Sequence, residues 1–173
     1  MADALRENRL SKFKLWSPLA PLILALAALT FGIDQTHKWW MLHVYGIETM
    51  GAVAITPFFE MVMAWNRGVS YGLLKSDGQW LLVMGAVAIC LGLWAWANRA
   101  TGTLQGAAIA LVIGGALSNA FDRVVYGAVA DFFHFFVGNF SWYVFNLADV
   151  AIVAGVGLLL YESVFVKPSH GNA

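Results

Sequence analysis

The sequence is poor in cysteine and in charge. It has a single cysteine, Cys90, and only 12% of its 173 residues are charged. One cysteine cannot form an intrachain disulfide, which excludes a disulfide-stapled secreted domain. The formal net charge is zero, so there is no basic excess of the kind that nucleic-acid binding requires. The chain also lacks a glycine-rich phosphate loop, so nothing indicates a nucleotide site.

Hydrophobic residues dominate what is present. They make up 60% of the chain, and the mean hydropathy is +0.70. Four stretches with little or no charge are long enough to cross the hydrocarbon core, which takes about 20 residues as a helix. We therefore predict an all-α integral membrane protein in which residues 1–173 form one membrane domain. The transmembrane helices are expected at about 16–34, 79–97, 103–120 and 147–166.

The basic residues predict the orientation. With four spans, both chain ends lie on one side, and that side holds more Lys and Arg than the other, so both termini are expected in the cytoplasm. The inner residues are Arg6, Arg9, Lys12, Lys14, Arg99 and Lys167, and the outer ones are Lys38, Arg67, Lys75 and Arg123. The first span is interpreted as a retained helix, because its A-x-A triplet lies inside the apolar run.

Two outer connections differ in character. Residues 35–78 are too long for a plain linker, and they contain β-prone runs at Ala52–Ile55 and Met61–Trp65 before a turn at 66–68. A small strand-rich extramembrane element is expected there. The connection 121–146 is dense in aromatic residues, which is typical of the belt at the membrane interface.

Two aspartates are the main candidates for chemistry. Asp149 lies one turn into the last helix after Asn146, which is compatible with a helix cap or with a functional carboxylate at membrane depth. Asp131 is the only charged residue between Arg123 and Asp149. A pair of carboxylates can share one proton, so that one acts as general base on water while the other donates to a carbonyl. The spacing alone leaves both interpretations open.

The remaining polar residues give weaker signals. Asp34 and Lys38 stand four apart and could form an interfacial ion pair or contribute to catalysis. Asp122 and Arg123 are interpreted as the end of the third helix, with snorkelling side chains. Asp131-x-x-His134 could supply two metal ligands, but no supporting motif is present and no metal is expected. No Ser or Cys nucleophile is expected beside a His–acid pair.

Taken together, five short segments resemble the bacterial signal peptidase II family. The resemblance runs over about residues 15–166, with the segments in the family's order and spacing. They read Asp34-Gln35-Thr36-His37-Lys38, Asn66-Arg67-Gly68-Val69-Ser70-Tyr71, Gly114-Gly115-Ala116-Leu117-Ser118-Asn119-Ala120-Phe121-Asp122-Arg123, Val129-Ala130-Asp131-Phe132 and Phe145-Asn146-Leu147-Ala148-Asp149.

The resemblance implies a membrane aspartyl endopeptidase of four helices with a small extracytoplasmic β-cradle, located in the bacterial inner membrane. Asp131 and Asp149 would be its catalytic pair. It would cleave prolipoproteins before a diacylglyceryl-modified cysteine, be the target of globomycin, and need no cofactor. Its partners would be these precursors and membrane lipids, not nucleic acid, and it would be a monomer. Residues implied to shape the site or bind substrate are Asp34, Lys38, Asn66, Gly68, Asn119, Arg123 and Asn146.

Some positions depart from the family pattern. His37 stands where Ser is usual, and Ser118 stands where Gly is usual, which predicts slightly looser helix packing near Asn119. Arg67 and Tyr71-Gly72 also differ, in the outer loop.

Two other functions are considered beside the peptidase. One is a small transporter or channel that uses Asp149 as an intramembrane proton or cation site. The other is a non-enzymatic assembly subunit held by small-residue helix faces.

Overall fold

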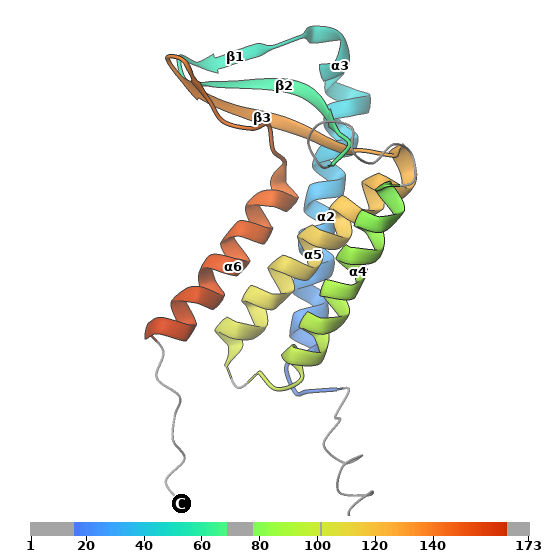
Figure 1. Ribbon diagram of the computed structural model, residues 1–173, viewed down its shortest axis with the longest axis vertical. Helices are drawn as coiled ribbons and strands as arrows, with labels where there is room; N and C mark the ends of the chain where they lie inside the picture. Colours follow the sequence, from blue (N-terminus) through green and yellow to red (C-terminus); the bar gives the residue numbers. More distant parts are fainter. Residues whose placement is uncertain (1–15, 69–77, 101, 166–173) are drawn as a thin grey trace, which may run out of the picture.

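Four long helices carry a small sheet across one end. The computed structural model describes residues 16–68, 78–100 and 102–165. The helices are α2 (Ala20–Trp40), α4 (Gly78–Ala97), α5 (Thr103–Tyr126) and α6 (Leu147–Phe165). The start of α2 and the end of α6 lie at the end of the molecule away from the sheet (Figure 1). The predicted basic residues before residue 16, together with Lys75 and Lys167, lie outside the described residues.

Helix α5 is the central element, with α6 on one side and α2 and α4 on the other (Figure 1). Glycines permit this close packing. A Cβ on Gly114 would lie 2.6 Å from the carbonyl oxygen of Ala27 in α2, and one on Gly115 would lie 2.6 Å from that of Ala148 in α6. Lipid tails are as apolar as side chains, so close backbone approach supplies much of the attraction between membrane helices.

Three helices, α4, α5 and α6, are long and apolar enough to cross a membrane. Many apolar side chains of α4 and α6 are exposed, as with Leu91 and Val153 at 65% each. Helix α2 does not meet the same criterion, because its last two turns carry several polar and charged residues. Three of the four predicted spans are therefore supported by length and composition, and the first stays a prediction.

Two helices match their predicted bounds and two run further. Helices α4 and α6 agree closely with the expected 79–97 and 147–166. Helix α2 was expected to end near residue 34 but continues to Trp40, followed by a π-helical turn, η1 (Met41–Tyr45), and by α3 (Ile47–Met50). Helix α5 was expected to end near 120 but reaches Tyr126. Asp34 and Asp122, which were expected to lie at helix ends, are paired with Lys38 inside the bundle. The two helices therefore continue past these residues.

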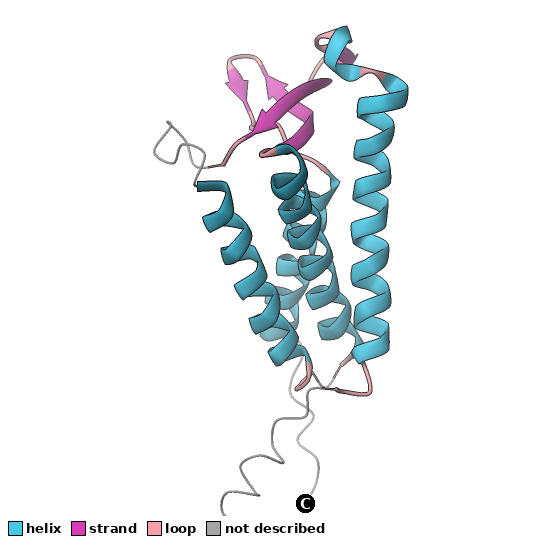
Figure 2. Ribbon diagram, turned by 90° about the vertical axis from the view of Figure 1, so that its right-hand side faces the viewer, coloured by secondary structure: helices cyan, strands magenta, loops and turns pink. Residues whose placement is uncertain are grey.

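The sheet brings together the two connections that the sequence predicts to lie on the outer side. Strands β1 (Val53–Thr56), β2 (Phe59–Asn66), β3 (Val129–Val137) and β4 (Phe140–Ser141) pair antiparallel in that order. The predicted strand-rich element at 35–78 is confirmed as β1 and β2. Strands β3 and β4 were not predicted, because their aromatic residues were interpreted only as an interfacial belt. Figure 2 shows the strands seated over the ends of the helices.

The pairing of β2 with β3 fixes the position of Asp131. Asn66 pairs with Val129, and Ala64 pairs with Asp131. Beneath this part of the sheet, Phe132 packs in a buried cluster with Met41 and Ile47. The sheet therefore holds Asp131 over the ends of the helices on its own side of the molecule.

Candidate active site

Asp131 lies in β3 with 1% of its surface exposed. One carboxylate oxygen accepts a hydrogen bond from Asn146 Nδ2 at 2.6 Å, and the other accepts one from Asn66 Nδ2 at 3.0 Å. Burial raises the pKa of Asp131 to about 6, and the charge of Asp149 adds to the rise, whereas the two asparagine bonds and Lys38 oppose it. The carboxyl therefore retains a proton at a pH where an exposed aspartate has lost it.

Asp149 is held in the first turn of α6. Its backbone N–H donates to Asn146 Oδ1 at 2.9 Å, and the backbone N–H of Asn146 donates to Asp149 Oδ2 at 3.2 Å. This reciprocal pair is a capping box. The other carboxylate oxygen, Oδ1, accepts from Asn119 Nδ2 at 2.8 Å. Asp149 thus serves as a helix cap and also belongs to a polar network, so the two sequence interpretations are compatible.

Asn146 connects the two aspartates. It is fully buried, and its side-chain nitrogen donates to Asp131 while its backbone nitrogen donates to Asp149. The same side-chain nitrogen lies 3.0 Å from Asn119 Oδ1. Asn119 in α5 therefore bonds to both Asn146 and Asp149. The two carboxylates predicted as a pair are placed on either side of one asparagine.

A buried charge cluster lies beside these asparagines. Lys38 Nζ is 2.7 Å from Asp34 Oδ2, 2.7 Å from Asp122 Oδ2 and 3.0 Å from Asn119 Oδ1. Lys38, Asp34 and Asp122 are each at most 2% exposed. The interfacial ion pair considered for Asp34 and Lys38 is therefore a buried one. The interpretation of Asp122 as a snorkelling helix end was wrong, because this carboxylate neutralises a buried ammonium group.

The carboxylate oxygens of the cluster also accept hydrogen bonds that join four elements, α2, α5, α6 and β3. Asp34 Oδ1 accepts from the backbone N–H of Ala148 in α6 at 2.9 Å, and Asp122 Oδ2 accepts from that of Ala130 in β3 at 3.3 Å. Ser118 Oγ donates to Asp34 Oδ2 at 2.6 Å, and Gln35 Nε2 donates to Asp122 Oδ1 at 2.7 Å. Gln35 and Ser118 were not predicted as site residues. Ser118 is fully buried, and its hydroxyl group links α5 to Asp34 of α2. Its position in the helix did not indicate this hydrogen bond.

The other predicted residues surround the same network. Arg123 Nη1 donates to the carbonyl oxygen of Asn119 at 3.0 Å, and its Nε is buried without a partner among the described residues. Asn66 Oδ1 accepts from the N–H of Gly68 at 2.9 Å. Gly68 has a φ of 77°, and a Cβ there would collide with the side chain of Leu82. All nine predicted site residues are therefore described, whereas Tyr71 and Gly72 lie outside the described residues.

Two observations concern alternative chemistries. Within residues 16–68, 78–100 and 102–165, no three His, Cys, Asp or Glu side chains are grouped to hold a metal ion. A serine beside a His–acid pair was not expected, and the structure contains one. His134 Nδ1 lies 2.8 Å from Glu60 Oε1, and its Nε2 lies 2.7 Å from Ser141 Oγ. Antiparallel pairing brings Glu60 of β2 beside His134 of β3, which is 74 positions away in the sequence, and brings Ser141 of β4 beside His134 from seven positions away.

Comparison with solved structures supports the fold. The chain resembles a bacterial membrane enzyme solved by the in meso method at 1.9 Å, with a TM-score of 0.74, 23% identity and coverage of 85% of this chain and 95% of that one. A second bacterial membrane enzyme, solved at 2.3 Å, gives a TM-score of 0.70 at 23% identity, with 88% and 95% covered.

Comparison with known sequences supplies the family. A protein of Methylocella silvestris named lipoprotein signal peptidase is 52% identical over 161 residues, covering 89% of this chain and 93% of the relative. A protein of Beijerinckia indica with the same name is 47% identical over 150 residues, covering 84% and 90%. The family profile described as signal peptidase (SPase) II matches residues 26–165. The chain therefore belongs to the signal peptidase II family, an aspartic-type peptidase family.

Proposed function

We propose that this protein removes signal peptides from prolipoproteins by hydrolysis at Asp131 and Asp149. The observation that carries the proposal is the placement of two carboxylates on one buried asparagine, with the pKa of Asp131 raised to about 6. Membership of the signal peptidase II family supports this activity and not the transporter or assembly alternatives.

The chemistry requires that the pair hold one proton. Two nearby carboxylates cannot both ionise cheaply, so one stays protonated while the other is charged. The charged carboxylate takes a proton from water as the water attacks the scissile carbonyl carbon. The protonated one donates its proton to the carbonyl oxygen. The titration belongs to the pair rather than to either residue.

The asparagines and Lys38 orient this pair. Asn119 Oδ1 accepts from both Lys38 and Asn146, which leaves its Nδ2 group directed at Asp149. Asn146 in turn directs its own Nδ2 group at Asp131. Asp34 forms an ion pair with Lys38 and so holds its ammonium group in position. We assign Asn66, Gly68 and Arg123 to the binding of the substrate backbone, as the family resemblance implies. Arg123 Nε is buried and has no hydrogen-bond partner among the described residues.

We further assign the placement in the membrane. Helix α2 would be the fourth span, since the polar residues that lower its hydropathy are satisfied by α5 and α6 instead of facing lipid. The termini would lie in the cytoplasm, and the sheet on the outer side of a bacterial inner membrane. A precursor cysteine that carries a diacylglyceryl group would then present its scissile bond at the outer interface. The protein would act as a monomer.

The test uses a purified prolipoprotein in diacylated and unmodified forms. Asp131→Asn and Asp149→Asn should each abolish cleavage of the diacylated precursor, and the unmodified precursor should resist the wild-type protein. Glu48→Gln, which removes an exposed carboxylate bonded to Trp65, is the matched control and should cleave normally. Cleavage by either aspartate variant would refute the assignment of the pair.

A further inference from the structure

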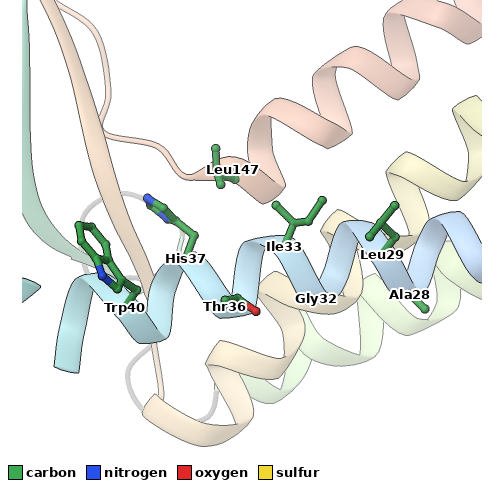
Figure 3. Close-up of a pocket in the computed structure, with 8 residues that line it drawn as sticks. All are labelled: Ala28, Leu29, Gly32, Ile33, Thr36, His37, Trp40 and Leu147. Carbon is green, nitrogen blue, oxygen red and sulfur yellow. The ribbon is translucent and has the colours of Figure 1, made fainter. Parts of the chain in front are cut away.

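The three histidines of the described residues have different surroundings. His37 of α2 lies beside an apolar groove (Figure 3), and its Nδ1 is buried without a hydrogen-bond partner among the described residues. His43 lies 3.0 Å, through Nδ1, from the carbonyl oxygen of Trp39. His134 of β3 instead has a polar side chain at each of its ring nitrogens. It is therefore the histidine whose contacts resemble those of a general base.

A hydroxyl, an imidazole and a carboxylate form a chain of hydrogen bonds across three strands. Ser141 Oγ lies 2.7 Å from His134 Nε2, and His134 Nδ1 lies 2.8 Å from Glu60 Oε1. The strand register produces this contact, because His134 pairs with Glu60, and Phe136, two residues further along β3, pairs with Ser141. Asp131 lies three residues before His134, so alternation turns it to the opposite face of β3. The chain of hydrogen bonds is thus separate from the aspartate pair.

These bonds determine which nitrogen of the neutral ring carries the proton. A carboxylate can only accept, so Nδ1 of His134 donates to Glu60 and Nε2 keeps a lone pair. The hydroxyl of Ser141 can then donate to Nε2, since its other acceptor, the carbonyl oxygen of Trp142, is farther away at 3.3 Å. A hydroxyl bonded to a base that a carboxylate orients is the arrangement that activates a serine nucleophile.

The nucleophile lies at an accessible edge of the sheet. Ser141 is exposed and belongs to β4, the last strand of the described sheet. The N–H of Trp142 donates to the carbonyl oxygen of Phe135 at 2.8 Å, and that of Phe136 donates to Phe58, away from β4, at 3.0 Å. Ser141 and Phe136 are therefore a non-hydrogen-bonded pair, in which the N–H of Ser141 points away from β3. This N–H can donate to the oxygen of a carbonyl group that Oγ attacks.

The surroundings of Ser141 indicate a class of substrate. Its two chain neighbours, Phe140 and Trp142, line an apolar hollow of about 260 Å³. Alternation turns them to the opposite face of β4, so an acyl group reaches the hollow by passing the edge where the Ser141 N–H points. An ester carbonyl is more electrophilic than an amide carbonyl, so an ester needs less help from oxyanion donors. A carboxylic ester with a short apolar acyl group fits both features.

We propose that Ser141, His134 and Glu60 form a second hydrolytic site, which cleaves carboxylic esters with short apolar acyl groups. Ser141 Oγ attacks the carbonyl carbon and gives its proton to His134 Nε2. The bond from that carbon to the alcohol oxygen then breaks, and the alcohol leaves with the proton. Water attacks the acyl-serine and gives a proton to Nε2, which returns it to Oγ as the acyl–Oγ bond breaks and the acid is released. Glu60 is a positioning residue that orients the ring.

Covalent labelling gives the first test. A fluorophosphonate reacts with activated serine hydroxyls, and mass spectrometry of peptides from the labelled, detergent-purified protein should place it on Ser141. Ser141→Ala should abolish the labelling. Ser163→Ala is the matched control, because it removes an exposed serine whose hydroxyl bonds only to the carbonyl oxygen of Leu160, and it should label as wild type does. Absence of label at Ser141 would overturn the proposal.

Ester hydrolysis gives the second test. With p-nitrophenyl butyrate, the wild-type protein should release a burst of nitrophenol equal in amount to the enzyme, as the acyl-serine forms. Ser141→Ala and His134→Gln should reduce hydrolysis to the rate without enzyme. Glu60→Gln should lower kcat at least about tenfold with KM unchanged, since it disturbs the orientation of the base and not the binding of the ester.

The controls separate this site from the aspartate pair. Ser141→Ala should keep the wild-type thermal midpoint and should cleave prolipoprotein at the wild-type rate. Ester hydrolysis by Ser141→Ala at the wild-type rate would show that another group is responsible and would overturn the proposal. Loss of prolipoprotein cleavage together with ester hydrolysis in this variant would also overturn it, because the two activities would then share one site.

Discussion

Replacing Asp131 with asparagine should change how the stability of the protein depends on pH. In the folded protein the pKa of Asp131 is about 6, compared with an ordinary value of 3.8. The folded state therefore binds this proton more tightly than the unfolded state. The resulting stabilisation is complete only well below pH 3.8, and it is lost as the pH rises through about 6.

The magnitude follows from the two pKa values. Each pKa unit corresponds to 1.36 kcal/mol, so the values of 3.8 and about 6 give about 3 kcal/mol in total. Part of this is already lost at pH 4, which leaves about 2 kcal/mol between pH 4 and pH 8. The Asp131→Asn variant has no ionisable group at this position, so its stability should not show this loss between pH 4 and pH 8. Any altered hydrogen bond to Asn66 or Asn146 costs the same at both pH values and cancels in the difference.

Thermal unfolding of the detergent-purified protein measures this effect. The midpoint of Asp131→Asn relative to wild type should rise by about 4–8 °C on going from pH 4 to pH 8, since 1 kcal/mol is worth about 2–4 °C in a chain of this length. Glu48→Gln removes an exposed carboxylate, and its thermal midpoint should change with pH as the wild-type midpoint does. If the Asp131→Asn and wild-type midpoints also run parallel, burial does not favour the protonated form of Asp131 and the reasoning is refuted.

Three further predictions follow from the same network. Lys38→Met leaves Asp34 and Asp122 buried without a cation and should lower the free energy of unfolding by about 3–5 kcal/mol; a thermal midpoint within a few degrees of wild type would contradict this. Gly115→Ala places a Cβ 2.6 Å from a carbonyl oxygen of α6 and should lower both the midpoint and the cleavage rate, whereas Gly85→Ala, in open space, should stabilise by up to about 1 kcal/mol. Because the aspartate pair must keep one proton, kcat/KM of the free enzyme should decline as the pH rises past about 6, and a flat profile from pH 5 to pH 8 would count against a shared proton.

Gaps between charges located the helices well where the charges face solvent. Helix α4 began and ended almost where its uncharged run did, whereas α6 contains Asp149 near its start and Glu162 near its end. The same rule failed at Asp34, Lys38 and Asp122, because these charges pair with one another inside the bundle. A sequence alone does not reveal whether a charge marks the end of a helix or has a partner on another helix.

Strand pairing was harder to predict than strand position. The β-prone runs in the 35–78 loop were recognised, but β3 was not, since its aromatic residues also suit a membrane interface. The register of β2 on β3 places Glu60 opposite His134 and aligns the end of β2 with Asp131. Such contacts join residues more than 60 positions apart and have no local signal.

The candidate site was predictable mainly through its resemblance to a family. Composition and spacing pointed to Asp131 and Asp149 but left a capping role open for Asp149. Ordered motifs supplied the asparagines, Arg123 and Gly68. Gln35 and Ser118 lie inside two of those motifs but were not predicted as site residues. Each contributes a hydrogen bond to a residue of another helix, and the residue type alone does not indicate such a bond.

The buried charge cluster also determines how the helices align along their axes. Apolar packing in lipid discriminates poorly between neighbouring axial alignments of two helices, because each alignment brings similar small residues and similar apolar surface into contact. A slip of α2 along α5 by one turn, about 5.4 Å, would separate Lys38 from Asp122, which lie 2.7 Å apart, and leave both ions stranded in a low-dielectric interior. Like the single polar residue that sets the register of a coiled coil, this cluster excludes misaligned bundles. The geometry around Asn146 is thereby fixed by helices that themselves have only one acceptable alignment.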